Sequence, residues 1–97
     1  MTSNRIDNKV RKAIYRREGY ACALCDTPQR LQIHHVILRS QGGRSTPQNM
    51  ICLCQQCHSL VHGVYKYPEG YLTQEDAQQA IIEYLADMYA PDWRPWE

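Results

Sequence analysis

Four cysteines in two equally spaced pairs are the residues with the most specific chemistry in this 97-residue sequence. The pairs are Cys22-x-x-Cys25 and Cys54-x-x-Cys57. A C-x-x-C turn presents two thiolates to one ion, and two such turns complete the tetrahedral shell that structural zinc prefers. The spacing therefore predicts a closed zinc site, which stabilises a fold and does no chemistry itself.

A fifth cysteine, Cys52, precedes the second pair by one residue. The C-x-x-C spacing selects Cys54 as the ligand, so we expect Cys52 to be a buried apolar thiol. Reduced cysteines suit the cytoplasm better than a disulfide framework would. We expect a cytoplasmic protein with no membrane partner, because no apolar run is long enough to span a bilayer and the polar start Met1-Thr2-Ser3-Asn4 lacks a signal-peptide profile.

The histidines form a second set of chemically capable residues around the cysteines. His34 and His35 lie between the two pairs, and His58 follows the second pair directly. Because four thiolates already satisfy one ion, these imidazoles and Asn49 are free to build another site, which the zinc would hold together. On a regular strand His34 and His35 point to opposite faces. For both histidines to act on one phosphate, that phosphate must lie at the end of the strand or the strand must be distorted.

His62 has two interpretations. It lies four residues after His58, on the same helical face, so it is a reasonable further ligand for the same ion. Alternatively, a histidine in the last helical turn before Gly63 complements the helix dipole without touching metal. The sequence leaves both open.

Charge is distributed unevenly along the chain, although the net charge is only +1. Residues 1–66 contain ten Lys and Arg and three acids, a balance of +7, and residues 67–97 contain one Arg and seven acids, a balance of −6. The basic part coincides with the Cys/His cluster and so favours a polyanion as partner. The alternative is that these charges are simply solvated faces.

The elements that must position these residues follow from periodicity and turn chemistry. We expect one domain over residues 1–97, because the chain is short and lacks Phe. Its expected parts are a basic helix over about 7–18, a strand over 30–33 leading into the histidines, a loop over 41–47, a short helix over 55–62, a C-terminal helix over 73–90 and an irregular tail over 91–97.

The two terminal helices are expected to be amphipathic. In the first, Ile6, Val10, Ala13 and Ile14 fall on one face and basic residues, Arg17 among them, occupy the rest. In the last, the apolar positions are Ala77, Ala80, Ile81, Tyr84, Leu85 and Met88. This stripe most simply packs on the domain. A protein partner that binds this helix or the tail with Trp93 and Trp96 is the alternative.

In their order along the chain, these motifs resemble the HNH nuclease motif in its zinc-bound form. The resemblance covers residues 9–63 and rests on Tyr20-x-Cys22-x-x-Cys25, Ile33-His34-His35-Val36, Gly42-Gly43, Asn49, Leu53-Cys54-x-x-Cys57-His58 and His62. It implies a ββα-metal (His-Me finger) core, a divalent cation at the active site and cleavage of phosphodiester bonds in DNA to 5′-phosphate and 3′-OH ends. With the flanking helices, the expected fold class is α+β.

The resemblance also implies residue roles. His35 matches the general base, and Asn49 matches the middle residue, which fixes the loop and orients that base. His34 and His58 match the ligands of the catalytic divalent ion. Arg39 and Arg44, in the connecting loop, are candidates for DNA phosphate contacts.

One departure from the family pattern concerns the metal. Many relatives carry Asp where this chain has His34, so the expected ion lies between imidazoles without a protein carboxylate. Mn²⁺, Ni²⁺, Zn²⁺ and Mg²⁺ are the candidates, and imidazole ligands disfavour Mg²⁺.

Rival functions stay open at this stage. A noncatalytic zinc-binding module would use the same basic surface to hold nucleic acid. An adaptor would use the terminal helix and tryptophans to recruit a protein. Small free-standing proteins of the HNH family are often phage-encoded and act in the host cytoplasm, which is the origin that the resemblance favours.

Overall fold

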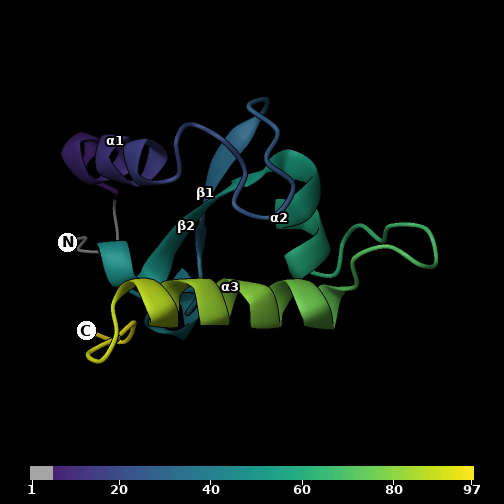
Figure 1. Cartoon of the computed structure of the whole chain (residues 1–97). Helices are drawn as coiled ribbons and strands as arrows, with labels where there is room; N and C mark the ends of the chain where they lie inside the picture. The colour runs from purple at the N-terminus through teal and green to yellow at the C-terminus, as the bar shows by residue number, and fades with distance from the viewer. Residues whose placement is uncertain (1–5) are drawn as a thin grey trace.

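The computed structural model describes residues 6–97 and has an α+β fold, which confirms the predicted fold class. Met1-Thr2-Ser3-Asn4 lies outside the described residues. A two-stranded antiparallel sheet lies among three helices (Figure 1). The elements are α1 (Asn8–Arg17), β1 (Leu31–His35), β2 (Met50–Cys54), α2 (Gln55–Val61) and α3 (Gln74–Met88), with short 3-10 turns at Arg39–Gln41 and Pro47–Asn49.

The sheet pairs the strand that contains both central histidines with a strand that leads into the second cysteine pair. In the register of β1 and β2, Leu31 lies opposite Cys54 and His35 lies opposite Met50. Sequence periodicity did not locate β2, because all five of its residues are buried and it therefore lacks the polar alternation of a half-exposed strand.

Each face of β2 has its own apolar cluster. Ile51 and Leu53 pack with residues of α2 and α3, among them Leu60. On the opposite face, Met50 and Cys52 pack with Ile14 of α1 and Ile33 of β1. Figure 1 shows α3 running beneath the sheet and α2, with α1 at the other side. The strand that precedes α2 is thus fixed from both sides.

The first helix agrees with its expected range, but two of its side chains do not lie where the helical face predicted. Asp7 caps α1 by accepting from Lys9 N at 2.8 Å. Ile14 is buried as expected. Ala13 is exposed, because the face of the helix that packs on the sheet is narrower than the apolar face predicted from the sequence. Arg17 was expected on the polar outer face and is instead half-buried.

Arg17 is drawn inward by an acidic neighbour. Its Nη2 lies 2.7 Å from Glu18 Oε2, and the Glu18 side chain is only 1% exposed. Glu18 also accepts from Tyr84 Oη at 2.8 Å. Although burial opposes the charged form, the hydrogen bond and charge of Glu18 raise the pKa of Arg17 overall. The pair joins α1 to α3 across the molecule.

The C-terminal helix is a packing element through one narrow stripe. Ala77, Ile81 and Leu85 are buried at four-residue intervals. Tyr84 and Met88, expected in the same stripe, are each 38% exposed because they lie at its rim. No helix among residues 6–97 is both long enough and apolar enough to cross a membrane.

The two tryptophans of the tail behave differently. The Trp93 ring is partly buried, and its Nε1 donates to Gln48 O at 2.8 Å. Trp96 is 63% exposed. Of the two possibilities for the tail, docking on the domain therefore holds for Trp93.

Candidate metal centres and active site

The four paired cysteines converge at the start of α2. Their Sγ atoms all lie within 4.8 Å of one another, and Cys25 Sγ is 3.6 Å from Cys54 Sγ. Zn–S bonds of about 2.3 Å imply tetrahedral edges of about 3.8 Å. The donor set and its spacing therefore fit a structural zinc.

Backbone N–H groups donate hydrogen bonds to two of these sulfur atoms, those of Cys54 and Cys22. Cys54 is the N-cap of α2 and its Sγ accepts from Cys57 N at 3.4 Å. Burial raises the pKa of the Cys22 thiol, but hydrogen bonds from backbone N–H groups of Cys54, Cys25 and Leu24 outweigh it and lower the pKa overall. A thiolate, the form that binds metal, is therefore favoured at this position.

Tyr67 is a contact of this cluster that the sequence analysis did not find. Its hydroxyl lies 3.4 Å from Cys57 Sγ. Burial and the hydrogen bond to Cys57 raise the pKa of Tyr67, so the phenol stays protonated. Nothing in the local sequence signals this contact, because Tyr67 lies ten residues from its partner in an irregular segment.

Cys52 lies outside the four-sulfur group. It is completely buried on the opposite face of β2, next to Ile14. Burial raises its pKa to about 12, so the thiol stays protonated near neutral pH. Its environment is that of a small apolar residue, as expected.

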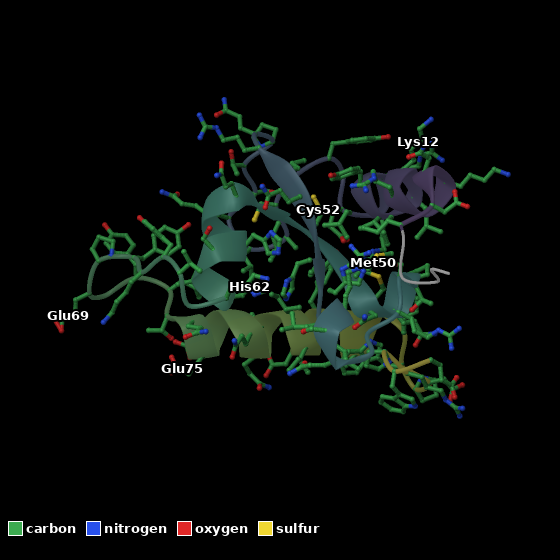
Figure 2. The ribbon with its side chains drawn as sticks, turned by 180° about the vertical axis from the view of Figure 1, so that it is seen from behind. Lys12, Met50, Cys52, His62, Glu69 and Glu75 are labelled. Atoms are coloured by element: carbon green, nitrogen blue, oxygen red, sulfur yellow. The ribbon has the colours of Figure 1, made fainter. Side chains whose placement is uncertain are left out.

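Three of the four histidines form a second cluster. The rings of His34 and His58 are 5.2 Å apart between centroids, those of His34 and His62 are 5.1 Å apart, and those of His58 and His62 are 4.8 Å apart. One nitrogen from each lies within 4.8 Å of the others. His34 comes from β1, His58 from α2 and His62 from the C-cap of α2; Figure 2 shows His62 at the end of α2 that lies next to α3.

Two imidazoles of this cluster, those of His34 and His58, favour the neutral form that binds metal. Burial, together with the neighbouring histidines, lowers the pKa of His34 to about 3. Burial also lowers the pKa of His58, with a smaller contribution from His62. Among residues 6–97, the His34 Nδ1 atom is buried without a hydrogen-bond partner. An unpartnered buried nitrogen beside two imidazoles fits a metal ligand.

Gln32 orients one of these rings and was not identified from the sequence. His58 Nδ1 lies 2.6 Å from Gln32 Oε1, which can only accept, so Nδ1 carries the proton and Nε2 keeps its lone pair. The spacing along the strand could have indicated this contact, because Gln32 lies two residues before His34 and therefore shares its face of β1.

His35 points to the other face of the sheet, at the last residue of β1. A surface pocket of about 420 Å³ is nevertheless lined by His35, His58 and His62 together. β1 pairs regularly with β2 up to His35. The strand is therefore not distorted at the histidines. Of the two expected arrangements, the one with a phosphate at the end of the strand matches this geometry.

The His35 ring is held by a residue that the sequence analysis missed. Its Nε2 lies 3.0 Å from Ser45 Oγ, so Nδ1 is the ring nitrogen that Ser45 does not contact. Burial, then the positive charge of Arg39, lowers the pKa of His35. A neutral imidazole near pH 7 has a lone pair available to accept a proton.

Asn49 is buried and holds the loop between the strands. Its Oδ1 accepts from Ile37 N at 2.7 Å, and its Nδ2 donates to Ile37 O at 3.1 Å and to Arg44 O at 2.8 Å. Val36 N donates to the Asn49 backbone oxygen at 2.9 Å. These bonds fix the chain on both sides of Arg39.

Gly43 tests how tightly this loop is packed. A Cβ atom there would lie 1.7 Å from Ile37 O, whereas at Gly42 it would meet nothing within 4 Å. We expect Gly43→Ala to displace the loop and to lower the melting temperature clearly, because the backbone that the added methyl group meets must move. The control Gly42→Ala, which only strains a positive φ at a cost of about 1–2 kcal/mol, should be milder. Equal loss of stability in both variants, measured by thermal melting, contradicts the close-approach argument.

The two arginines of the loop are both exposed. Arg39 lines the pocket with His35. Arg44 is connected to the site through its backbone oxygen, which Asn49 binds. The structure thus brings together His35, His58, His62 and Arg39, and leaves the Arg44 side chain at the surface.

Comparisons with known proteins agree with this arrangement. Residues 22–63 match the model of the family described as HNH endonuclease. The protein Anaredoxin from Nostoc sp. is 36% identical over 55 residues, which are 56% of this chain and 72% of that protein. The type IV methyl-directed restriction enzyme EcoKMcrA from Escherichia coli is 47% identical over 32 residues, 33% of this chain but only 12% of that enzyme.

Proposed function

Because the chain belongs to the HNH endonuclease family, we propose that it is a metal-dependent endonuclease that hydrolyses phosphodiester bonds in DNA. The observation that best supports this proposal is the pocket where His35 opens beside His58 and His62. It offers a proton acceptor and two of the three imidazoles of the metal-ligating cluster on one surface.

His35 acts as the general base. With Nε2 engaged by Ser45, Nδ1 accepts a proton from water as the water oxygen attacks phosphorus. The bond from phosphorus to the 3′ oxygen breaks, the phosphate stays on the 5′ end, and the 3′ oxygen takes a proton from solvent. Asn49 positions His35 indirectly, through the loop that contains Ser45.

His34, His58 and His62 would hold the divalent ion, which supplies positive charge to the phosphate and the leaving oxygen when it is bound. His62 is included because its ring packs against both others. Cys22, Cys25, Cys54 and Cys57 would hold a separate structural zinc. The cysteine site would stabilise the fold, and the histidine site would take part in the reaction.

The DNA backbone is held by basic side chains around the pocket. Arg39 contacts phosphate near His35, and Arg44 contacts phosphate farther along the loop. Figure 2 shows Lys12 on the outer side of α1, pointing away from the sheet, where it adds to the same positive field. The similarity to EcoKMcrA covers a small part of that enzyme, so it supports cleavage chemistry and not recognition of methylated DNA.

The ligand set predicts the metal preference. In the part of the chain that the structure describes, the cluster of three histidines contains no carboxylate. We expect Mn²⁺ or Ni²⁺ to support faster nicking of supercoiled plasmid than Mg²⁺, because imidazole suits softer ions. The assay compares these ions at equal concentration with zinc-loaded protein. The highest rate with Mg²⁺ argues against ligation by three imidazoles.

The same plasmid assay separates the nuclease from its main rival. A nuclease produces open-circular or linear DNA when a divalent ion is added. A noncatalytic zinc-binding module instead gives salt-sensitive DNA binding and no strand breaks with any ion. Absence of breaks across the metal series, with DNA binding intact, replaces the proposal with the binding module.

A further inference from the structure

The backbone around Asn49 is held by α1, which precedes the segment matched by the family model. Arg17 Nη2 donates to Met50 O at 2.6 Å, and Arg17 Nη1 donates to Pro47 O at 2.8 Å. One guanidinium thus bridges carbonyl groups on both sides of Asn49. The planar fork of arginine suits this task, since two N–H groups point to two acceptors at once.

The C-terminal tail holds the same segment at a different point. Trp93 Nε1 donates to Gln48 O at 2.8 Å, and the backbone N–H of Arg94 donates to Gln48 Oε1 at 2.5 Å. These contacts join residues 45 or 46 positions apart in the chain. The carbonyl groups of three residues around Asn49 therefore have partners outside residues 22–63.

Both supports are themselves fixed. Arg17 is paired with Glu18, and its Nη1 also lies 2.9 Å from Tyr89 Oη at the end of α3. The Arg17 guanidinium lies 5.9 Å from the centre of the Tyr89 ring. Trp93 packs against the larger apolar cluster. Neither support depends on a freely rotating surface side chain.

The supported segment leads directly to the pocket. Asn49 uses its whole side-chain amide to hold Ile37 and Arg44, and Ser45 beside Arg44 contacts the His35 ring. A shift of the Asn49 backbone therefore changes the position of the loop and of the hydroxyl that orients His35. Small displacements of this kind are costly when a base and a phosphate must be aligned.

We propose that Arg17 and Trp93 are positioning residues of the endonuclease: together they hold the Asn49 segment, and through it the loop that orients His35. This inference rests on the proposed function. It assigns an active-site role to the N-terminal helix and the tail, although both lie outside residues 22–63, the segment that the family model matches. The residues act through Asn49 and touch no substrate.

The test compares two tryptophan variants of the zinc-loaded 97-residue chain. Trp93→Phe removes the N–H donor and keeps an aromatic ring. We expect kcat for plasmid nicking to fall about tenfold while KM for DNA stays within about twofold, because alignment is lost and binding is not. Trp96→Phe, at the exposed tryptophan, is the matched control and should leave kcat and KM unchanged.

A second variant approaches the segment from α1. Arg17→Lys keeps the charge, but one ammonium group cannot reproduce the bidentate bridge, so a similar loss of kcat is expected. Unchanged kcat in both Trp93→Phe and Arg17→Lys overturns the proposal. A raised KM at constant kcat also overturns it, since the tail would then be a DNA contact.

Amide hydrogen exchange keeps the test independent of activity. In Trp93→Phe the Ile37 amide, which donates to Asn49 Oδ1, should exchange about tenfold faster while amides within α3 keep their rates. If the wild-type protein cuts no DNA, the proposed function fails, and the Ile37 exchange rate still decides whether the tail holds the loop. An unchanged Ile37 rate refutes that connection.

Discussion

Replacing His35 with alanine should lower plasmid nicking by about 10²–10⁴-fold while leaving zinc content unchanged. In the proposed mechanism this imidazole accepts the proton of water, and its lowered pKa keeps it neutral near pH 7. It lies at the end of β1 beside the pocket and outside the four-sulfur cluster. Because His35 is only 7% exposed, alanine also removes buried packing and should lower the melting temperature.

His35→Gln separates the chemical role from a structural one. Glutamine retains a polar side chain for Ser45 but has no basic nitrogen, so it should be as inactive as alanine. The measurements are single-turnover nicking rates, zinc content and circular dichroism for both variants and the wild type. Cleavage by His35→Gln at close to the wild-type rate makes His35 a positioning residue and requires another base.

Removing the structural ion should unfold the central part of the protein. Structural zinc in small domains contributes about 10–16 kcal/mol, more than the net stability of a typical domain. Cys57 is completely buried at the start of α2, where the helix, β2 and the loop with Tyr67 meet. We therefore expect Cys57→Ser to lose zinc and cooperative thermal unfolding together.

Cys52→Ala is the matched control, because this thiol is equally buried but lies outside the cluster. It should keep one zinc per chain and lose only about 1 kcal/mol of stability from the missing sulfur atom. Metal analysis and thermal melts followed by circular dichroism give both quantities. Retention of zinc and of a sharp melting transition by Cys57→Ser refutes the assignment of the four cysteines to one ion.

The helices, the first strand and the fold class could be predicted from the sequence because their signals are local. Capping residues, a glycine after a helix and apolar positions at helical spacing lie within a few residues of one another, as in Asp7 and α1 or Thr73 and α3. The cysteine pairs are equally local, since each is one turn. Ligand chemistry then limits what four such sulfurs can hold.

Only the tertiary structure decided how the site is supported. β2 could not be located from the sequence, because all of its residues are buried and it lacks polar alternation. The roles of Gln32, Ser45 and Trp93 depend on partners that the sheet and the loop bring together. Arg17 shows the reason most clearly. Its charge favours an outer position, but Glu18 and the carbonyl groups of Pro47 and Met50 together satisfy it inside the molecule. Such a balance between burial and hydrogen bonding depends on distances between segments far apart in the chain, which residue spacing does not contain.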